Sequence, residues 1–440
     1  MAVFEGITGS AASEIAESIR AQVDRGDLGP GVALPSIRDL AEHLAVNRNT
    51  VAAAYAQLAG AGLVESRRRG GTVVLGVPLL EAEGVSSDAA TTNLASGNPD
   101  RLLLPSLGRF LGGGYVPPLY GSSPVSENLG AWVERHMVPD VEGECDLVVT
   151  HGAVDAVERL LGAYLTRGDL VAVEDPCFLS SIGTLRLNGF RTAAVLVDAE
   201  GMVPGALEAA LRAGARAVIC TPRAQNPTGA SITAGRSHSL SAILEAFPDV
   251  LVIEDDHFSA ISDAPYRRIT PASSRRWALV RSVSKFLGPD LRVALVLSDP
   301  ETSRRLGARL SSATTWVSHI LQNAVATMLA DQGTIQLLGK ARATYSRRSS
   351  RLISELRRHG IEVAGPADGL NVWIPLGGRE PRVVDALRAR GWAVRAGSAF
   401  SVSDHPIRAI RVTTAGMTED EAARFANDLT GVLGTAAGNS

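Results

Sequence analysis

The chain has 440 residues, of which 45% are hydrophobic and 20% are charged, and its formal net charge is −3. This length is enough for two or three domains with a large core, and the charge leaves any contact with nucleic acid to a local patch. No basic head followed by an apolar run opens the chain, and no stretch of about 18 apolar residues occurs, so neither a signal peptide nor a membrane span is predicted. The three cysteines lack metal-ligand spacing and fit a reducing cytoplasm, so a cytoplasmic protein without a metal site is expected.

The first 76 residues have the apolar spacing of short amphipathic helices. Ile15, Ile19 and Val23 recur at helical spacing. After Ser36 and again after Asn47, both good N-caps, the same spacing recurs: Ile37, Leu40, Ala41 and Leu44 in one helix, and Val51, Ala54, Tyr55 and Leu58 in the next. Two such helices joined by a tight turn are typical of a helix-turn-helix.

A basic hairpin is predicted after these helices. Two short β-type runs, 63–66 and 72–75, flank the sequence Arg67-Arg68-Arg69-Gly-Gly. Three adjacent arginines suit a phosphate backbone or a minor groove, so the hairpin resembles a DNA-binding wing.

The start of the second helix is where a recognition helix meets DNA, and it leaves Arg48, Asn49 and Thr50 exposed. Residues 1–76 carry seven arginines against eight carboxylates, so the module is not basic overall. A small helical cap with solvated arginines is the alternative, but the order of three helices and a basic hairpin favours DNA binding.

The segment also resembles the winged helix of GntR-type repressors. The matching stretches are 34–41, 47–51 with Ala54 and Tyr55, and 70–73. This resemblance implies that Arg38, Arg48 and Thr50 touch DNA phosphates or base edges, and that Gly71 shapes the wing.

Residues 77–92 are small, acidic and without periodicity, and they are predicted to be a linker. The expected organisation is therefore a DNA-binding module in 1–76, a linker in 77–92 and a large domain in 93–440.

The large domain is predicted to be α/β. Apolar β-type runs alternate with helical stretches, at 147–150, 171–174, 217–221, 250–254, 278–283 and 292–297. Continuous apolar strands separated by helices indicate a mostly parallel sheet covered on both faces, and such sheets bind ligands beyond the carboxyl ends of their strands.

Lys285 stands out at one of these ends. Two of the 43 basic residues are lysines, Lys285 and Lys340, and the other 41 are arginines. A lysine amine can lose its proton and attack a carbonyl, which an arginine cannot do. Lys285 follows Ser282-Val-Ser284, with Arg292 seven residues on, as expected for a Schiff-base lysine beside a phosphate site. A solvent-facing lysine at a strand end is the alternative.

Four other strand ends carry polar or aromatic residues that are ambiguous singly. They are Thr150-His-Gly-Ala-Val154, Glu174-Asp-Pro-Cys-Phe178, Asn226-Pro-Thr-Gly229 and Glu254-Asp-Asp-His-Phe258. A helix start suits a phosphate, and a buried carboxylate needs a cationic partner, either a pyridinium nitrogen or a neighbouring arginine.

Together these motifs resemble fold-type I aminotransferases over essentially all of 93–440, with a smaller C-terminal α+β subdomain. The resemblance implies that Lys285 binds pyridoxal 5′-phosphate as an internal aldimine. It assigns the other cofactor contacts as follows: Asp255 to the pyridine nitrogen, Asn226 and His257 near the ring hydroxyl, Phe178 against the ring, and Ala153, Ser282, Ser284 and Arg292 at the phosphate, with Tyr120 reaching in from a partner subunit. Arg411 matches the arginine that clamps an amino-acid carboxylate.

Two positions depart from the aminotransferase pattern. His257 stands where those enzymes usually carry a tyrosine. Asp155 lies at the phosphate end, where the related regulators often have glutamine, and it is expected to point away. Both departures leave cofactor binding in place and weaken the case for efficient turnover.

A GntR-like winged helix followed by an aminotransferase-like domain resembles the MocR regulators over the whole chain. That resemblance implies a head-to-tail homodimer that binds operator DNA in response to pyridoxal phosphate or its external aldimine with an amino compound. Control of vitamin B6 or of amino-acid and amine metabolism is expected, with sensing rather than turnover as the role of the large domain. A working aminotransferase with an accessory domain is the alternative, and a cofactor pocket that only supports dimerisation is a third.

Overall fold

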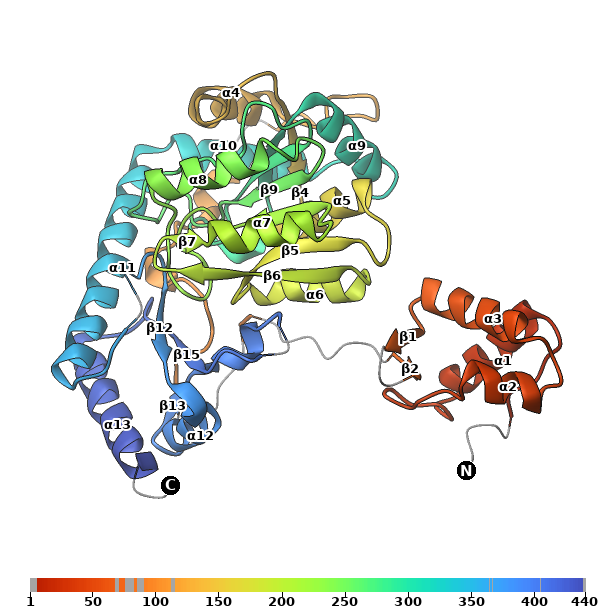
Figure 1. The fold of residues 1–440 in the computed structure, drawn as a ribbon. Helices are drawn as coiled ribbons and strands as arrows, with labels where there is room; N and C mark the ends of the chain where they lie inside the picture. The colour runs from red at the N-terminus through yellow and green to blue at the C-terminus, as the bar shows by residue number, and fades with distance from the viewer. Residues whose placement is uncertain are drawn as a thin grey trace. The chain divides into compact units, whose positions relative to one another are not determined.

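The computed structural model describes residues 6–67, 71–75, 83–84, 91–111, 115–363, 365, 367–403 and 405–437. Contacts group the chain into two compact units, and the boundary along the sequence falls between Leu80 and Glu81, within the predicted linker. Figure 1 shows both units, which are described separately here.

The N-terminal unit consists of α1 (Ala12–Asp24), α2 (Ile37–His43), α3 (Arg48–Gly60), β1 (Val64–Arg67) and β2 (Gly71–Val74). Both predicted caps form, because Ser36 Oγ accepts the Asp39 N–H at 3.1 Å and Asn47 Oδ1 accepts the Asn49 N–H at 2.8 Å. The strands pair antiparallel, as the hairpin prediction requires.

The core of this unit gathers the apolar faces of all three helices. The fully buried side chains include Ile15, Ile19, Leu40, Val51 and Leu58. Ile37 shares the apolar spacing of α2 but is 38% exposed, and it occupies the first helical position beside the cap.

The large unit is built on an eight-stranded sheet in the order β4-β11-β10-β9-β8-β5-β6-β7. Its strands are β4 (Asp146–Thr150), β5 (Leu170–Asp175), β6 (Arg191–Asp198), β7 (Gly201–Met202), β8 (Ala217–Cys220), β9 (Leu251–Asp255), β10 (Trp277–Ser282) and β11 (Ala294–Ser298). Strands β10, β9, β8, β5 and β6 pair parallel in that order. Strand β11 runs antiparallel to both neighbours, and β7 is antiparallel to β6, so the predicted mostly parallel sheet is confirmed.

Helices cover both faces of this sheet (Figure 1). Val171 and Val173 of β5 belong to the core cluster that includes residues of α5, α6 and α9, whereas Ala172 between them belongs to the cluster that includes residues of α4, α7, α8, α10 and α11. Strand β5 therefore buries both of its faces, which explains its continuous apolar run. These helices are α4 (Glu127–His136), α5 (Ala153–Tyr164), α6 (Leu179–Leu187), α7 (Pro204–Arg212), α8 (Ala234–Leu244), α9 (Pro300–Ser311), α10 (His319–Ala330) and α11 (Gln332–Arg358).

A smaller subdomain completes the large unit, as predicted. The antiparallel sheet β12-β15-β14 and the short parallel pair β13-β3 pack with α12, α13 and the C-terminal part of α11 around a second core. The bounds are β3 (Thr92–Asn93), β12 (Asn371–Pro375), α12 (Glu380–Ala389), β13 (Trp392–Ala393), β14 (Arg395–Ala396), β15 (Ala409–Thr413) and α13 (Glu419–Ala437).

Candidate functional site

The reversed strand β11 brings the predicted site residues to one edge of the sheet. Ala294, at the start of β11, lies opposite both Ser282 at the end of β10 and Thr150 at the end of β4. Because β11 is antiparallel, its first residue lies where its neighbours end, and Arg292 just before it joins the same edge.

Lys285 lies at this edge, half-buried, while Lys340 is exposed as predicted. The Lys285 amine donates a hydrogen bond to the Gly97 carbonyl at 2.7 Å. Burial lowers the pKa of Lys285, and the Arg411 charge lowers it further, against the opposing effect of Glu83 and Asp255. A lower pKa increases the share of neutral amine, the form that can attack a carbonyl.

The three acids that end β9 differ in what satisfies them. Glu254 accepts hydrogen bonds from Tyr266 and Thr270, and Asp256 pairs with Arg223 and Arg281. Asp255, by contrast, is 4% exposed and its Oδ1 has no hydrogen-bond partner in the part of the chain that the structure describes.

That contrast bears on the two partners predicted for a buried carboxylate. The arginines bind Asp256, which leaves Asp255 short of a donor. A protonated ring nitrogen is a group that would supply one, since a buried unpaired carboxylate is costly.

The helix start at the end of β4 forms a cradle with Arg292. Gly152 precedes α5 at a φ of 94°, and a Cβ there would lie 3.0 Å from Arg292 Nη2. Arg292 itself has a φ of 48° and donates to the His151 carbonyl at 3.2 Å. Ala153 is the first residue of α5, so its backbone N–H belongs to the group that suits a phosphate.

The remaining residues at the predicted phosphate end lie close to these groups in sequence. Ser282 and Ser284 lie 3.1 Å apart through their hydroxyl oxygens. Asp155 forms an ion pair with Arg159, whose Nε lies 2.7 Å from the Asp155 carboxylate. The acid at this end of the site is thus matched by an arginine of its own helix.

Two aromatic rings stand beside Asp255. Phe178 and His257 stack with ring centroids 5.7 Å apart and an interplanar angle of 28°. His257 Nδ1 lies 3.2 Å from Asp255 Oδ2, yet neither ring nitrogen makes a hydrogen bond of good geometry within the described residues. The His257 imidazole therefore has a ring N–H available as a hydrogen-bond donor beside Asp255.

Arg411 occupies the middle of the small sheet and is fully buried. Its guanidinium binds both oxygens of Glu83, at 2.5 and 2.8 Å, and also the Asn226 side-chain oxygen at 3.0 Å. The predicted carboxylate clamp is thus filled by a carboxylate of the chain itself.

Burial alone would raise the pKa of Glu83, but the hydrogen bonds and charge of Arg411 outweigh it and hold the pKa below its usual value. Glu83 is a residue of this cluster that sequence reasoning did not identify. It lies in an aperiodic acidic stretch, and nothing in that pattern distinguishes one glutamate from its neighbours.

Several predicted site residues lie apart from this cluster. Tyr120 is 89% exposed and its ring contacts Trp316, so it does not enter the site of its own chain. In the N-terminal unit Arg38, Arg48 and Asn49 are exposed and Thr50 is half-buried. Gly71 has a φ of 71°, which favours glycine at this turn. The remaining wing arginines fall outside what the structure describes, namely Arg68, Arg69 and the side chain of Arg67.

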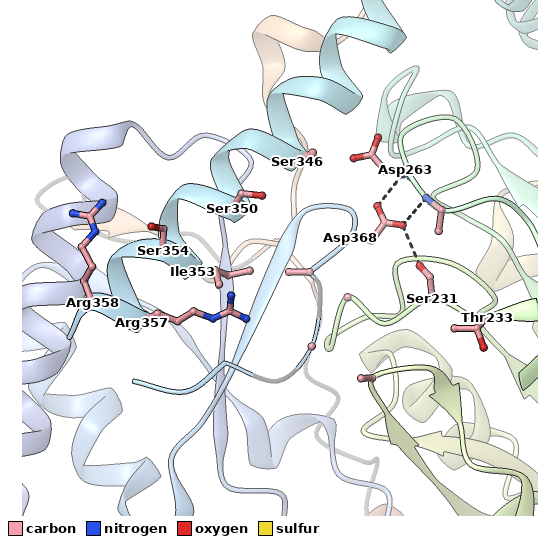
Figure 2. Close-up of a pocket in the computed structure, with 15 residues that line it drawn as sticks. Ser231, Thr233, Asp263, Ser346, Ser350, Ile353, Ser354, Arg357, Arg358 and Asp368 are labelled. Atoms are coloured by element: carbon pink, nitrogen blue, oxygen red, sulfur yellow. Dashed lines mark hydrogen bonds between the residues drawn. The ribbon is translucent and has the colours of Figure 1, made fainter. Parts of the chain in front are cut away.

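A separate cavity of about 960 Å³ lies between α11 and the loop around Asp368. Figure 2 shows Ser346, Ser350 and Ser354 along one side and Asp368 opposite. The Asp368 carboxylate accepts from Ser231 and from the Asp263 and Gly369 N–H groups, so it already has its partners. None of the predicted site residues lines this cavity.

Within the described ranges, no group of three or more His, Cys, Asp and Glu side chains is placed to hold a metal ion. None of the helices described is long and apolar enough to cross a membrane.

The fold matches solved aminotransferases. The α-aminoadipate aminotransferase LysN from Thermus thermophilus, in complex with N-(5′-phosphopyridoxyl)-L-leucine, superposes with a TM-score of 0.70 at 23% identity, over 80% of this chain and 94% of that one. The model of aminotransferase class I and II matches residues 92–429, and that of the bacterial regulatory proteins of the gntR family matches residues 11–74.

Two curated relatives are transcriptional regulators by name. The vitamin B6 salvage pathway transcriptional repressor PtsJ of Salmonella typhimurium is 46% identical over 427 residues, 96% of this chain and 98% of that protein. The pyridoxine biosynthesis transcriptional regulator PdxR of Corynebacterium glutamicum is 29% identical over 77% of each chain. The chain therefore belongs to the MocR-type regulators, in which a GntR-type DNA-binding region precedes an aminotransferase class I and II domain.

Proposed function

We propose that this protein is a transcriptional regulator of vitamin B6 metabolism that binds pyridoxal phosphate in its large unit and operator DNA through residues 1–76. The observation that carries the proposal is the 46% identity to the vitamin B6 salvage repressor over 96% of the chain. Identity at that level spans both units, so it supports the same combination of DNA binding and cofactor sensing.

The side chains at the sheet edge fit pyridoxal phosphate. When bound, this cofactor supplies an aldehyde that condenses with amines and a ring that withdraws electrons once its nitrogen is protonated. Lys285 would hold the aldehyde, and the unpaired Asp255 Oδ1 would receive the ring nitrogen. Arg292, with the N–H groups at the start of α5, would hold the phosphate, while Phe178 would lie against the ring.

The N-terminal unit supplies the contacts to DNA in this proposal. Arg48 and Asn49 are exposed at the start of α3, and Arg38 is exposed on α2. They would bind phosphates and base edges, with the arginines 67–69 at the adjoining groove. A head-to-tail homodimer would present two such modules to two half-sites.

Coupling between the units requires the ligand to bind two conformations with different affinity. Pyridoxal phosphate itself is the simplest effector, since a regulator of vitamin B6 genes has to sense the product of that metabolism. An amino compound joined to the cofactor is the second candidate, because Arg411 could bind its carboxylate.

An active aminotransferase is the less favoured function. The chain carries a DNA-binding region that such an enzyme does not need, and His257 stands at the position where those enzymes usually have tyrosine. A slow half-reaction remains compatible with Lys285 at the site.

The proposal is tested by combining absorption spectroscopy with a DNA mobility shift on the intergenic region beside the gene. We expect a visible absorption band that is lost in Lys285→Ala, and an operator affinity that changes at least about fivefold on addition of pyridoxal phosphate. Pyridoxine phosphate, which lacks the aldehyde, serves as the control ligand.

Each outcome has a separate meaning. The absence of a visible absorption band would contradict the cofactor assignment. Equal DNA affinity with and without pyridoxal phosphate would make that molecule a fixed cofactor rather than the effector. Many rapid turnovers with an amino donor and a keto acid would favour the enzyme.

A further inference from the structure

Glu83 binds Arg411 in the way a free carboxylate would. Each of its oxygens meets a different guanidinium nitrogen, Oε1 with Nη1 at 2.5 Å and Oε2 with Nη2 at 2.8 Å. Asn226 Nδ2 adds a third hydrogen bond to Oε1 at 3.0 Å. Two parallel charge-assisted bonds are the arrangement by which arginine recognises carboxylates most strongly.

The surrounding backbone is shaped for this carboxylate. The Gly84 N–H donates to the Ser96 carbonyl at 3.0 Å, which fixes the chain next to Glu83. Gly97 has a φ of 63°, and a Cβ at that position would lie 2.4 Å from Glu83 Oε2. A glycine at position 97 therefore leaves the space that the Glu83 carboxylate fills.

The same glycine connects Glu83 to the reactive lysine. The Gly97 carbonyl accepts the hydrogen bond of the Lys285 amine at 2.7 Å, and its N–H donates to Thr413 Oγ1 at 3.0 Å. Lys285, Glu83 and Arg411 thus all lie against the loop at Gly97. An amino acid whose nitrogen replaced that of Lys285 at the cofactor aldehyde would direct its carboxylate to the position that Glu83 holds.

We propose that Glu83 is an internal competitor for Arg411, which makes the site selective for pyridoxal phosphate and for amines that lack an α-carboxylate. An α-amino acid binds only by displacing Glu83, whereas a simple amine needs no such displacement. This inference rests on the proposed role of the site in binding pyridoxal phosphate.

The test compares L-alanine with ethylamine, which is alanine without its carboxylate. Each is titrated into the full-length protein loaded with pyridoxal phosphate, and binding is followed by the change in visible absorption. In Glu83→Gln, which removes the competing charge and keeps the side-chain size, we expect alanine to bind about tenfold more tightly or better, and ethylamine to change less than about twofold.

Glu208→Gln is the matched control, because Glu208 pairs with Arg212 on the surface of α7. It should leave both affinities at the wild-type value. Equal alanine affinity in the wild type and in Glu83→Gln would overturn the inference, even if pyridoxal phosphate binds and alters DNA affinity.

A second arm needs no cofactor. In cofactor-free Glu83→Ala, acetate should fill the vacated clamp and raise the melting temperature relative to chloride at equal ionic strength, while the wild type should show no such difference. Absence of acetate-specific stabilisation in Glu83→Ala would contradict the internal competitor. Because this arm omits pyridoxal phosphate, its result is separable from a failure of the proposed function.

Discussion

Asp255 and Asp256, which lie next to each other at the end of β9, differ in their hydrogen-bond partners. Asp256 sits in a buried network with Arg223 and Arg281, at distances of 2.5 and 2.8 Å, so it contributes to stability. Asp255 lacks a partner for Oδ1 among the described residues, so its ionised form is costly until a donor arrives. The roles of these two adjacent aspartates can therefore be distinguished by substituting each one separately.

The Asn variants of this pair should behave in opposite ways. Asp255→Asn should leave the free energy of unfolding of the cofactor-free protein within about 1 kcal/mol and weaken pyridoxal phosphate binding at least about tenfold, because the ring nitrogen loses its anionic partner. Asp256→Asn should lower that free energy by about 3 kcal/mol, because it leaves two buried arginines underpaired. Urea unfolding measures the free energy of unfolding, and absorption titration measures the affinity for pyridoxal phosphate. If both variants changed these two quantities in the same way, the distinction between Asp255 and Asp256 would be refuted.

Glu174 makes the stability of the large unit depend on pH. It is 3% exposed, and burial raises its pKa to about 7, although hydrogen bonds from Thr221 and Gln225 oppose the shift. Between the usual value of 4.5 and about 7, the unfolded chain has released this proton and the folded chain has kept it. Stability should therefore fall as pH rises through this window, by about 3 kcal/mol from this group, and level off above it.

Glu174→Gln tests this directly, because an amide cannot titrate. We expect urea unfolding of the cofactor-free variant to lose this part of the pH dependence, while Glu208→Gln keeps the wild-type profile. An unchanged slope in Glu174→Gln between about pH 5 and pH 7 would show that Glu174 is ionised throughout.

At the residue scale, the sequence indicated the positions of some site candidates and not of others. Lys285, Asp255 and Asn226 were predicted because they follow apolar runs, and parallel strands bring their carboxyl ends to one edge. Tyr120 and Glu83 could not be placed in that way. Tyr120 depends on a second subunit in the proposed dimer, and Glu83 depends on a contact between positions 328 residues apart.

At the scale of elements, the N-terminal helices depend on their caps. Helix α2 has only seven residues, and its Ser36 cap satisfies one of the four N–H groups that a helix start leaves free. Short helices gain little from propensity, so the cap and the buried Leu40 and Ala41 stabilise α2.

Ser36→Ala should lower the local stability of α2 by about 1 kcal/mol. Hydrogen exchange of the amides in residues 37–43 measures that loss in the intact protein. Ser13→Ala on the exposed face of α1 is the control, and it should leave α2 unchanged. Equal protection in Ser36→Ala and the wild type would mean that the side-chain cap contributes nothing.

One strand of the large sheet was not predicted. Strand β6 (Arg191–Asp198) contains the apolar run Ala193–Val197, and most of its residues are exposed or half-buried. Its neighbour β5 and the central strand β9 were predicted, and nearly every residue in them is buried. An apolar run alone does not distinguish a strand from a buried helix segment, so such runs do not identify every strand.

For the whole molecule, exposed apolar side chains bear on the proposed second copy of the chain. Between positions 115 and 120 the large unit exposes Val116 at 85%, Leu119 at 77% and Tyr120 at 89%, and Leu102 is also 86% exposed. Apolar clusters of this kind mark interaction sites, and the proposed dimer would cover this one. Val116→Asp combined with Leu119→Asp should give a monomer by light scattering, whereas Lys340→Asp, at an exposed site of α11, should leave the assembly unchanged.

The dimer makes a sharper prediction about Tyr120. Because Tyr120 is 89% exposed in its own chain, we expect it to complete the cofactor site of the partner, where its hydroxyl would bind the phosphate. Tyr120→Ala should then remain dimeric and bind pyridoxal phosphate about tenfold more weakly, as expected for a lost hydrogen bond to a charged group.

Mixed dimers decide which chain Tyr120 serves. In a dimer of Lys285→Ala with Tyr120→Ala, the Tyr120→Ala subunit keeps its lysine and receives an intact tyrosine from its partner. One site of wild-type affinity per mixed dimer is therefore expected in an absorption titration, although neither homodimer has any. If Tyr120 acted within its own chain, the only site with a lysine would lack its tyrosine, and no tight site would appear.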